Sequence, residues 1–540
     1  MGNHVGVRFP SPAPINRKNR YIIMKEDDLS FKLKDIETAY TTLMRAKALA
    51  EKGKNNEAEI ICKELITNFP KYYAAHRELA KIYIEQKQFY SAFQHLALAL
   101  SGDQSDYFSL LNMEALFYEF GMYETGRDFS TLIDIIGDKK GIRQHSEVHI
   151  YNKGKLLLKN KEYEKAANEF INCLLIHPDN EDIAINLIEC YEAIGEIQKA
   201  LNIIEKFISK NGGKRNTFIY LASTLPQKLI QNNLIKYTKF LERITVNDNE
   251  EIQRLFALAR FYHMGKRYGQ AWETIIKAND SVKLIIKDKY LDDKRWEEEF
   301  LSWARNTDFD VPPIAEDEPD TLPLYMLGPS RSGKSCLEKA LDWLPGVKLG
   351  FENKLLSNAT SRTFNAGDRL PATFLPFLPE SLLTDFVFCY RAMFRENARG
   401  ASLYTTTTPG LITSVPAIMY ALPKAKFIFL KRNPLDTAFR MYFKYYRNSH
   451  YHSCDIDWSL GYIQWYYDLV GLWEQKFPRA VLTVAYADLV SRPMAELKRI
   501  LAFLGISADV PEDLAIPNDS GFSDPYHALY NKKEEALPPL

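Results

Sequence analysis

Residues 328–335 combine the residue types that bind a phosphate-like anion. They read Gly-Pro-Ser-Arg-Ser-Gly-Lys-Ser and directly follow a short apolar run. This order predicts a strand, a glycine-bearing loop and the start of a helix, an arrangement in which several backbone N–H groups point at one spot. Arg331 and Lys334 add positive charges, and Ser332 and Ser335 add hydroxyl donors. The segment therefore predicts an anion site at the end of a strand.

A second strand-to-helix junction of the same kind lies in residues 427–440. It supplies an apolar strand, a turn that contains Arg432 and a helix start that contains Arg440. Arginine binds phosphate oxygens through two parallel hydrogen bonds where the geometry permits. Two basic junctions in one domain predict a ligand with phosphate at both ends.

The composition of the whole chain narrows the possible functions. Its 540 residues suffice for at least two domains, and 69 basic and 69 acidic side chains give a formal net charge of zero. Such a balance argues against a protein that coats nucleic acid. The six cysteines form no C-x-x-C pair, which is typical of reduced thiols in a cytoplasmic protein. No apolar run reaches eighteen residues, so no membrane span is expected.

Residues 1–30 differ from the rest of the chain because they show no periodicity and no long apolar segment. We expect a disordered leader rather than a signal peptide. Met24 is an alternative start of the protein.

Residues 31–305 predict a helical repeat domain. Small residues recur every 34 residues at Ala58, Ala92 and Gly126, and again at Ala166 and Ala200, and Ala271 follows about two repeats later. A second set of small residues precedes these by twelve positions, and a set of bulky residues by nine. These sets are Ala46, Ala80, Gly154 and Ala259, and Tyr83, Phe117, Tyr191 and Tyr262. Small residues let antiparallel helices approach closely, while the aromatic rings fill the space between pairs.

This period resembles the tetratricopeptide repeat, although Glu114 and Ile188 stand where small residues are expected and residues 214–250 are poorly marked. The resemblance implies a superhelix whose concave face binds a protein or peptide partner. The alternative is that the array only scaffolds the neighbouring domain.

Residues 306–322 are rich in proline and acid, which predicts a linker. Beyond it, we expect residues 323–540 to form a mostly parallel sheet covered by helices on both faces, since strand candidates alternate with helical stretches. The predicted strands are 323–327, 386–390, 426–430 and 481–485. The predicted fold class is thus an α-helical solenoid followed by a three-layer α/β domain.

Residues 328–335 also satisfy the Walker A pattern of nucleoside triphosphate sites. A kinase or NTPase needs in addition an apolar strand that ends in an aspartate to hold Mg²⁺. Here residues 427–430 run into Lys431 and Arg432, and residues 481–485 run into Tyr486. The kinase or NTPase interpretation stays as an alternative.

Three segments together resemble the sulfotransferases that use 3′-phosphoadenosine 5′-phosphosulfate (PAPS). Residues 329–335 resemble their phosphosulfate-binding loop, residues 431–443 their 3′-phosphate signature, and residues 486–505 their C-terminal Y-x-D-L-V block. Bacterial proteins that join tetratricopeptide repeats to this domain are known, and the resemblance implies the same arrangement here, with a P-loop-like fold.

The resemblance implies a role for each predicted site residue. Arg331 would hold the 5′-phosphosulfate and offset the charge that develops as the S–O bond breaks. Arg432 would bind the 3′-phosphate. Arg440 replaces the usual serine, and an arginine there either binds the same phosphate or crowds the site. The remaining predicted donor contacts are Ser332, Gly333, Lys334 and Ser335. No metal is required.

The acceptor hydroxyl needs a general base. Glu352 stands where repeat-bearing members of the family place a glutamate, and Asp385 is a weaker candidate. His450, His452 and Cys454 suggest a metal site, but no fourth ligand cluster accompanies them, so a substrate-facing loop is the preferred interpretation.

The resemblance predicts transfer of a sulfuryl group to a hydroxyl or amine. A peptide tyrosine or a saccharide would suit as acceptor. Two departures from the family pattern stand out: a lysine is missing at residues 406–409, and the usual C-terminal arginine is missing at residues 519–525. A non-catalytic adaptor with a degenerate second domain is therefore a further alternative.

Overall fold

The computed structural model describes residues 33–530, with gaps at 87, 120–121, 141–146, 160, 210–221, 223–226, 232, 245, 247, 310–318, 365–379 and 447–449. The predicted leader, and most of the predicted linker, lie outside the described residues. The chain divides into two compact units, residues 1–103 and 104–540. The domain boundaries drawn from the sequence stay a prediction.

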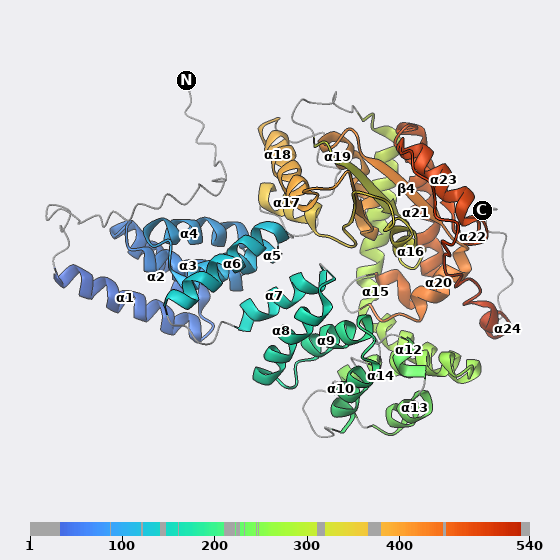
Figure 1. The fold of residues 1–540 in the computed structure, drawn as a ribbon, viewed down its shortest axis with the longest axis horizontal. Helices are drawn as coiled ribbons and strands as arrows, with labels where there is room; N and C mark the ends of the chain where they lie inside the picture. The colour runs from blue at the N-terminus through green and yellow to red at the C-terminus, as the bar shows by residue number, and fades with distance from the viewer. Residues whose placement is uncertain are drawn as a thin grey trace. The chain divides into compact units, whose positions relative to one another are not determined.

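The first unit consists of α-helices in antiparallel pairs (Figure 1). Ala58, Ala80 and Ala92 are fully buried between them, as the predicted repeat requires. The helices are α1 (Leu33–Glu51), α2 (Asn55–Asn68), α3 (Tyr73–Glu85) and α4 (Phe89–Gly102).

The second unit opens with further helices of the same kind. Ala166, Ala200 and Ala271 are again fully buried. Glu114, which takes the place of a small residue, is buried too, and its carboxylate accepts hydrogen bonds from Ser130 and His149. The helices are α5 (Tyr107–Glu119), α6 (Tyr123–Lys139), α7 (Glu147–Lys159), α8 (Tyr163–Ile176), α9 (Glu181–Ala193), α10 (Ile197–Ser209), α12 (Gln227–Gln231), α13 (Leu234–Arg243), α14 (Asp248–Met264) and α15 (Tyr268–Asn306).

Five parallel strands of the described chain then form one sheet, in the order β2-β3-β1-β4-β5. Because the strands are parallel, their carboxyl ends share one edge, where ligands of such sheets bind. The strands are β1 (Leu322–Leu327), β2 (Val347–Leu349), β3 (Leu403–Thr406), β4 (Lys426–Lys431) and β5 (Val481–Ala485).

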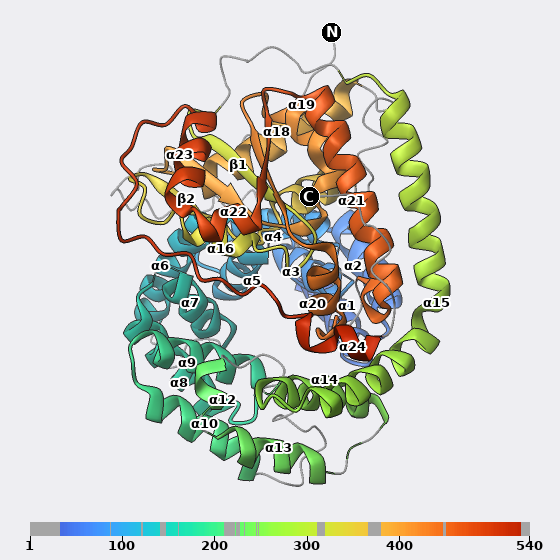
Figure 2. The same ribbon diagram turned by 90° about the vertical axis from the view of Figure 1, so that its right-hand side faces the viewer.

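Helices cover both faces of the sheet, as predicted (Figure 2). Alternate residues of β1 and β4 enter two separate cores, which is why residues 324–327 and 427–430 are all apolar. One core includes α17 (Leu355–Phe364), α18 (Glu380–Asn397), α19 (Val415–Ala421) and α21 (Ile456–Lys476), and the other includes α16 (Lys334–Lys339), α22 (Tyr486–Ser491) and α23 (Pro493–Leu504). The remaining elements are α20 (Pro434–Tyr442), α24 (His527–Tyr530) and the 3₁₀ turns η3 (Pro409–Ser414), η4 (Tyr451–Cys454) and η5 (Asp524–Tyr526).

One predicted strand is wrong, because residues 386–390 belong to the helix α18. Its buried aromatic and methionine side chains are Phe386, Tyr390, Met393 and Phe394, a spacing that places them on one helical face, while Phe388 is exposed. A five-residue apolar run does not distinguish the two structures by itself. The short strands β2 and β3 were not predicted.

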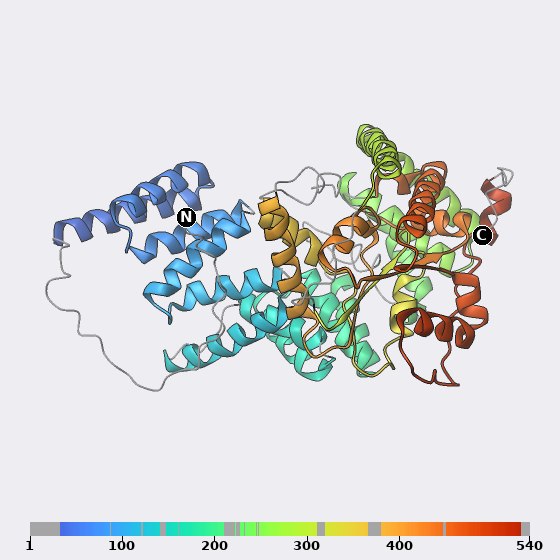
Figure 3. The same cartoon turned by 90° about the horizontal axis from the view of Figure 1, so that it is seen from above.

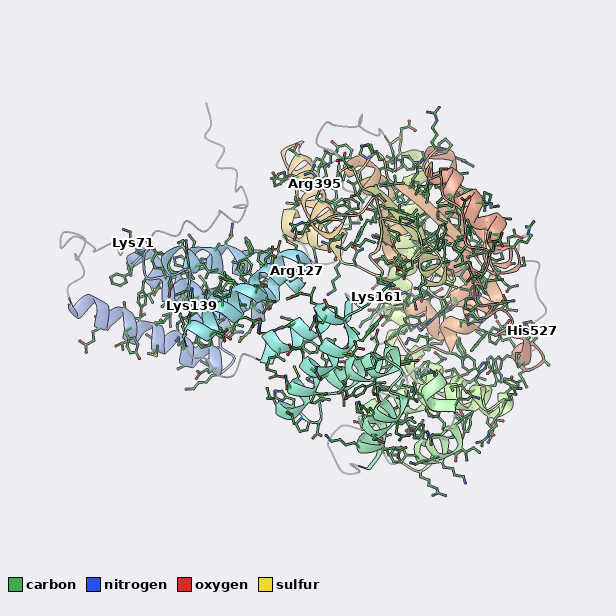
Figure 4. The ribbon with its side chains drawn as sticks, in the orientation of Figure 1. Lys71, Arg127, Lys139, Lys161, Arg395 and His527 are labelled. Carbon is green, nitrogen blue, oxygen red and sulfur yellow. The ribbon has the colours of Figure 1, made fainter. Side chains whose placement is uncertain are left out.

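The last repeat helices pack directly on the sheet domain. Trp272 of α15 stacks on Phe439 of α20 with ring centroids 5.7 Å apart, and the buried Asn279 side chain donates to the Tyr442 carbonyl at 2.9 Å. The helix α15 then continues beside α21, where the Trp465 indole donates to the Glu297 carbonyl at 2.8 Å (Figures 2 and 3). At the surface, Lys161 (labelled in Figure 4) pairs with Asp342 at 2.7 Å.

Among the described helices, none combines the length and the apolar character that a membrane crossing requires.

The substitution Asn279→Ala tests this packing. It leaves the Tyr442 carbonyl without its buried donor, so we expect the free energy of unfolding to fall by about 1–3 kcal/mol. Urea denaturation measures the change, and Ser281→Ala, which removes an exposed hydroxyl of the same helix, is the control. A loss no larger than that of the control would contradict a structural role for this contact.

Candidate functional site

The loop after β1 has the form that the sequence predicts. Gly333 adopts φ +101° and caps α16, while Gly328 adopts φ +155°. A side chain on Gly333 would lie 2.7 Å from the ring of Tyr486, and one on Gly328 would lie 2.4 Å from the Ser332 hydroxyl. Both positions therefore require glycine on steric grounds.

Lys334 folds back over this loop. Its buried ammonium donates to the carbonyl oxygens of Gly328 and Pro329, each at 2.9 Å. Burial lowers the pKa of Lys334 to about 7; the charge of Glu352 partly offsets this effect, and that of Arg331 adds to it. The lysine holds the loop in place and is able to gain a proton when an anion arrives.

Two buried hydroxyl groups near the loop have no hydrogen-bond partner among the described residues. They are Ser332 Oγ and Thr407 Oγ1, the second of which follows β3 at the same edge of the sheet. Buried polar groups without partners are rare and often mark the place of a ligand. Ser330 differs, since its hydroxyl lies 2.6 Å from that of Tyr446, and Ser335 is exposed.

The second basic junction meets the first. Arg432 follows β4, and Asn433 caps α20 by accepting from the backbone N–H of Asp436 at 2.9 Å. The Arg432 guanidinium is buried and donates to the Arg331 carbonyl at 3.4 Å. The structure thus brings the two segments into contact, 101 residues apart in the chain.

Arg432 and Arg440 share two carboxylates. Asp436 accepts from both at 2.9 to 3.1 Å, and Asp519 lies 2.9 Å from Arg432 and 3.1 Å from Arg440. The Arg432 guanidinium also covers the ring of Tyr486, 4.3 Å from its centroid. The sequence prediction of site residues did not include Asp436, Asp519 or Tyr486.

Two further cations lie near Arg331, and the sequence prediction missed both. Burial lowers the pKa of Lys444 to about 8 and that of Arg260 to about 10, and the charge of Arg331 lowers each further. No acceptor among the described residues contacts the Lys444 ammonium. Arg260 belongs to α14, whose Phe256 packs on Tyr445 with ring centroids 5.2 Å apart. The repeat region therefore adds a positive charge beside the loop.

Glu352 lies on the exposed segment after β2, close enough to act on the pKa of Lys334. This segment is tied to α16 by the buried Glu338, whose carboxylate accepts from the Phe351 N–H at 3.0 Å and from the Thr405 hydroxyl. Glu338 therefore positions Glu352 relative to the loop, a role that its sequence position did not reveal. Asp385 is exposed on α18.

A cavity of about 630 Å³ opens beside this site. It reaches β1 at Tyr325 and the end of β3 at Thr406, and its walls are mostly apolar and aromatic. His450 and His452 line it; burial lowers the pKa of His450 to about 4, and the charges of Lys334 and Arg331 add to the effect. Other walls include Trp296, Tyr390, Tyr462, Trp465 and Asn353.

Three residues around the site have left-handed backbones without being glycine. They are Arg331 with φ 68°, Phe351 with φ 51° and His450 with φ 56°. Such a conformation costs about 1–3 kcal/mol and is frequent at functional sites. The described residues contain no group of three or more His, Cys, Asp or Glu side chains arranged to hold a metal ion.

Two segments of the chain match known protein families. Residues 323–510 match the model of the sulfotransferase family, and residues 157–212 match that of the tetratricopeptide repeat. An uncharacterized protein of Aquifex aeolicus is 23% identical over 366 residues, which cover 65% of this chain and 47% of that protein. Sulfotransferase 1A1 of Rattus norvegicus is 27% identical over 122 residues, which cover 21% of this chain and 39% of that protein.

The chain thus spans less than half the length of these curated relatives. Among solved structures, a sulfotransferase from Alicyclobacillus acidocaldarius shares 16% identity with a TM-score of 0.26, over 40% of this chain and 92% of that one. From the two family matches, this chain joins tetratricopeptide repeats to a domain of the sulfotransferase family.

Proposed function

We propose that this protein transfers a sulfuryl group from PAPS to a hydroxyl or amine acceptor. The observation that supports the proposal most is the contact between the two basic junctions, in which Arg432 donates to the Arg331 carbonyl. A nucleotide with anionic groups at its 5′ and 3′ positions needs two such sites at one edge of the sheet.

The proposed donor contacts follow from this arrangement. The 5′-phosphosulfate would meet Arg331, the Lys334 ammonium and the backbone N–H groups near Gly333. The Ser332 hydroxyl, buried without a partner among the described residues, would donate to the same end, and Ser335 would assist from α16. The 3′-phosphate would meet Arg432 and Arg440. In the reaction, the sulfur forms a bond to the acceptor oxygen as its bond to the phosphate oxygen breaks, and a base takes the acceptor proton.

The acceptor would bind in the cavity of about 630 Å³. This volume suits a small molecule or a single side chain, and the aromatic walls favour an acceptor with an apolar body. The walls also present polar and charged side chains, among them Asp292, Asp293, Asn353 and Thr408, so a protruding peptide tyrosine and a saccharide are both candidate acceptors.

The repeat helices would bind the acceptor protein or a separate partner, since tetratricopeptide arrays commonly mediate protein contacts. Two features favour a direct part of the repeat helices in the reaction over a role as an adaptor that only binds a partner. Arg260 places a repeat charge beside the loop, and Trp296 of α15 lines the cavity.

Calorimetry with 3′-phosphoadenosine 5′-phosphate (PAP), the desulfated product, tests the proposal against the alternatives. We expect PAP to bind and ATP with Mg²⁺ to bind far more weakly, because no strand of the described sheet ends in a metal-binding aspartate. Arg331→Ala should weaken PAP binding, while Arg499→Ala, which removes an exposed arginine of α23, should not. A preference for ATP with Mg²⁺ would indicate an NTPase, and no nucleotide binding at all would indicate an adaptor.

The general base can be identified by two substitutions. With Glu352 as base, Glu352→Gln should lower turnover by about 10²–10⁴ while PAP affinity stays nearly constant. His450 is the second candidate because it lines the cavity and is neutral near pH 7. Its variant, His450→Gln, should then retain most turnover. If turnover falls in His450→Gln and not in Glu352→Gln, His450 is the base. If Glu352→Gln loses PAP affinity, Glu352 has a structural role.

Donor binding should take up protons. Near pH 8, Lys334 with a pKa of about 7 is mostly neutral and Lys444 with a pKa of about 8 is half protonated. Nearby phosphate charges favour the protonated forms and raise both pKa values, so protons enter on binding near pH 8 but hardly near pH 6. Calorimetry of PAP binding in buffers of different ionisation enthalpy measures this uptake. Lys334→Met should reduce it, and Lys426→Met, at the opposite end of β4, should not; equal uptake in all three proteins would refute the assignment.

A further inference from the structure

The loop between α23 and η5 places a carboxylate on the two arginines of the predicted 3′-phosphate site. Asp519 of this loop forms ion pairs with Arg432 and Arg440, and its backbone carbonyl accepts from Arg432 at 2.9 Å and also from Arg440. The Tyr486 hydroxyl donates to the same carboxylate. Five interactions thus converge on one residue of a loop that has no regular secondary structure.

The local charges balance in this arrangement. Arg432 and Arg440 contribute two positive charges, and Asp436 and Asp519 contribute two negative ones, so the net charge is zero. A phosphate group that approaches would meet the Asp519 carboxylate at the atoms it needs for its own hydrogen bonds. Like charges at such a separation oppose binding. The phosphate and Asp519 therefore compete for the same donors.

Of the two carboxylates, Asp519 is the one that is able to leave. Asp436 is buried on α20, pairs with both arginines at i±4 positions and accepts from the Ser523 N–H at 3.0 Å. The Asp519 side chain is 56% exposed. The loop is anchored on either side, by the buried Ile516 and by Phe522, which stacks on His263, so the Asp519 carboxylate can turn away from the arginines without disturbing these anchors.

We propose that Asp519 is a specificity-determining residue for the donor, which competes with the 3′-phosphate for Arg432 and Arg440 and is displaced when the donor binds. This inference rests on the proposed function. According to this inference, the Asp519 carboxylate lowers the affinity of the chain for 3′-phosphorylated nucleotides. Removing the charge of Asp519 while the loop stays intact should then strengthen the binding of the 3′-phosphate and leave the rest of the nucleotide site unchanged.

The test compares PAP with AMP, which lacks the 3′-phosphate, by calorimetry on the full chain and on Asp519→Asn. Asparagine retains an oxygen that accepts from Tyr486, and the backbone carbonyl contacts remain. We expect PAP to bind on the order of tenfold more tightly to the variant, with AMP affinity unchanged. Higher salt should narrow the difference between the two proteins. The control is Asp524→Asn, which removes a carboxylate of the neighbouring turn η5.

PAP affinity that stays constant or falls in Asp519→Asn, in protein with an unchanged melting temperature, would overturn the inference while leaving the proposed function intact. The same holds if AMP gains as much affinity as PAP, because the effect would then not depend on the 3′-phosphate. If neither the wild-type chain nor the variant binds PAP, the proposed function fails and this inference fails with it. Arg432→Ala should abolish the preference for PAP over AMP in both backgrounds.

Discussion

The burial of the Arg432 guanidinium is the constraint on which the rest of the site depends. A buried cation requires partners for its donors, and here they come from three parts of the chain: the Arg331 carbonyl, the Asp436 carboxylate and the Asp519 loop. Removing any one of them would leave a charge in a region from which water is largely excluded. Because these partners belong to the loop after β1, to α20 and to the C-terminal loop, this one side chain fixes all three segments relative to the sheet.

The electrostatics of the two halves of the site differ. Around Arg432 the positive charges are matched by carboxylates, whereas around Arg331 they accumulate, with Lys334, Lys444 and Arg260 nearby. Burial and mutual repulsion lower the pKa of Lys334, Lys444 and Arg260. Their positive charges would stabilise a bound anion, but they reduce the stability of the folded protein. Such a distribution favours anion binding beside Arg331 over anion binding beside Arg432.

The parts of the fold that depend on local sequence could be predicted, and those that depend on distant partners could not. Gly328 and Gly333 predict the loop because a turn of this form excludes side chains, and the small residues of the repeats predict close helix packing. The segment 386–390 is wrongly predicted as a strand because its helical period becomes visible only with Met393 and Phe394.

The site residues that the sequence did not predict are Lys444, Arg260 and Asp519. They join the site through tertiary contacts alone, and nothing in the neighbouring sequence distinguishes them from other surface charges. The predicted roles of Arg331, Glu352, Arg432 and Arg440 stay predictions, although the structure places these residues at one edge of the sheet.

The long helix α15 belongs to two hydrophobic cores at once. Its first turns, with Ala271 and Ile275, pack against α14, and its last turns, with Phe300 and Ala304, pack under the sheet. Severing the chain at the predicted linker would therefore strip a sulfotransferase-family fragment of the surface that covers Phe439, Tyr442 and Trp465, and leave it prone to aggregation. The sheet domain of this chain is thus not a self-contained folding unit, because α15 covers part of its apolar surface.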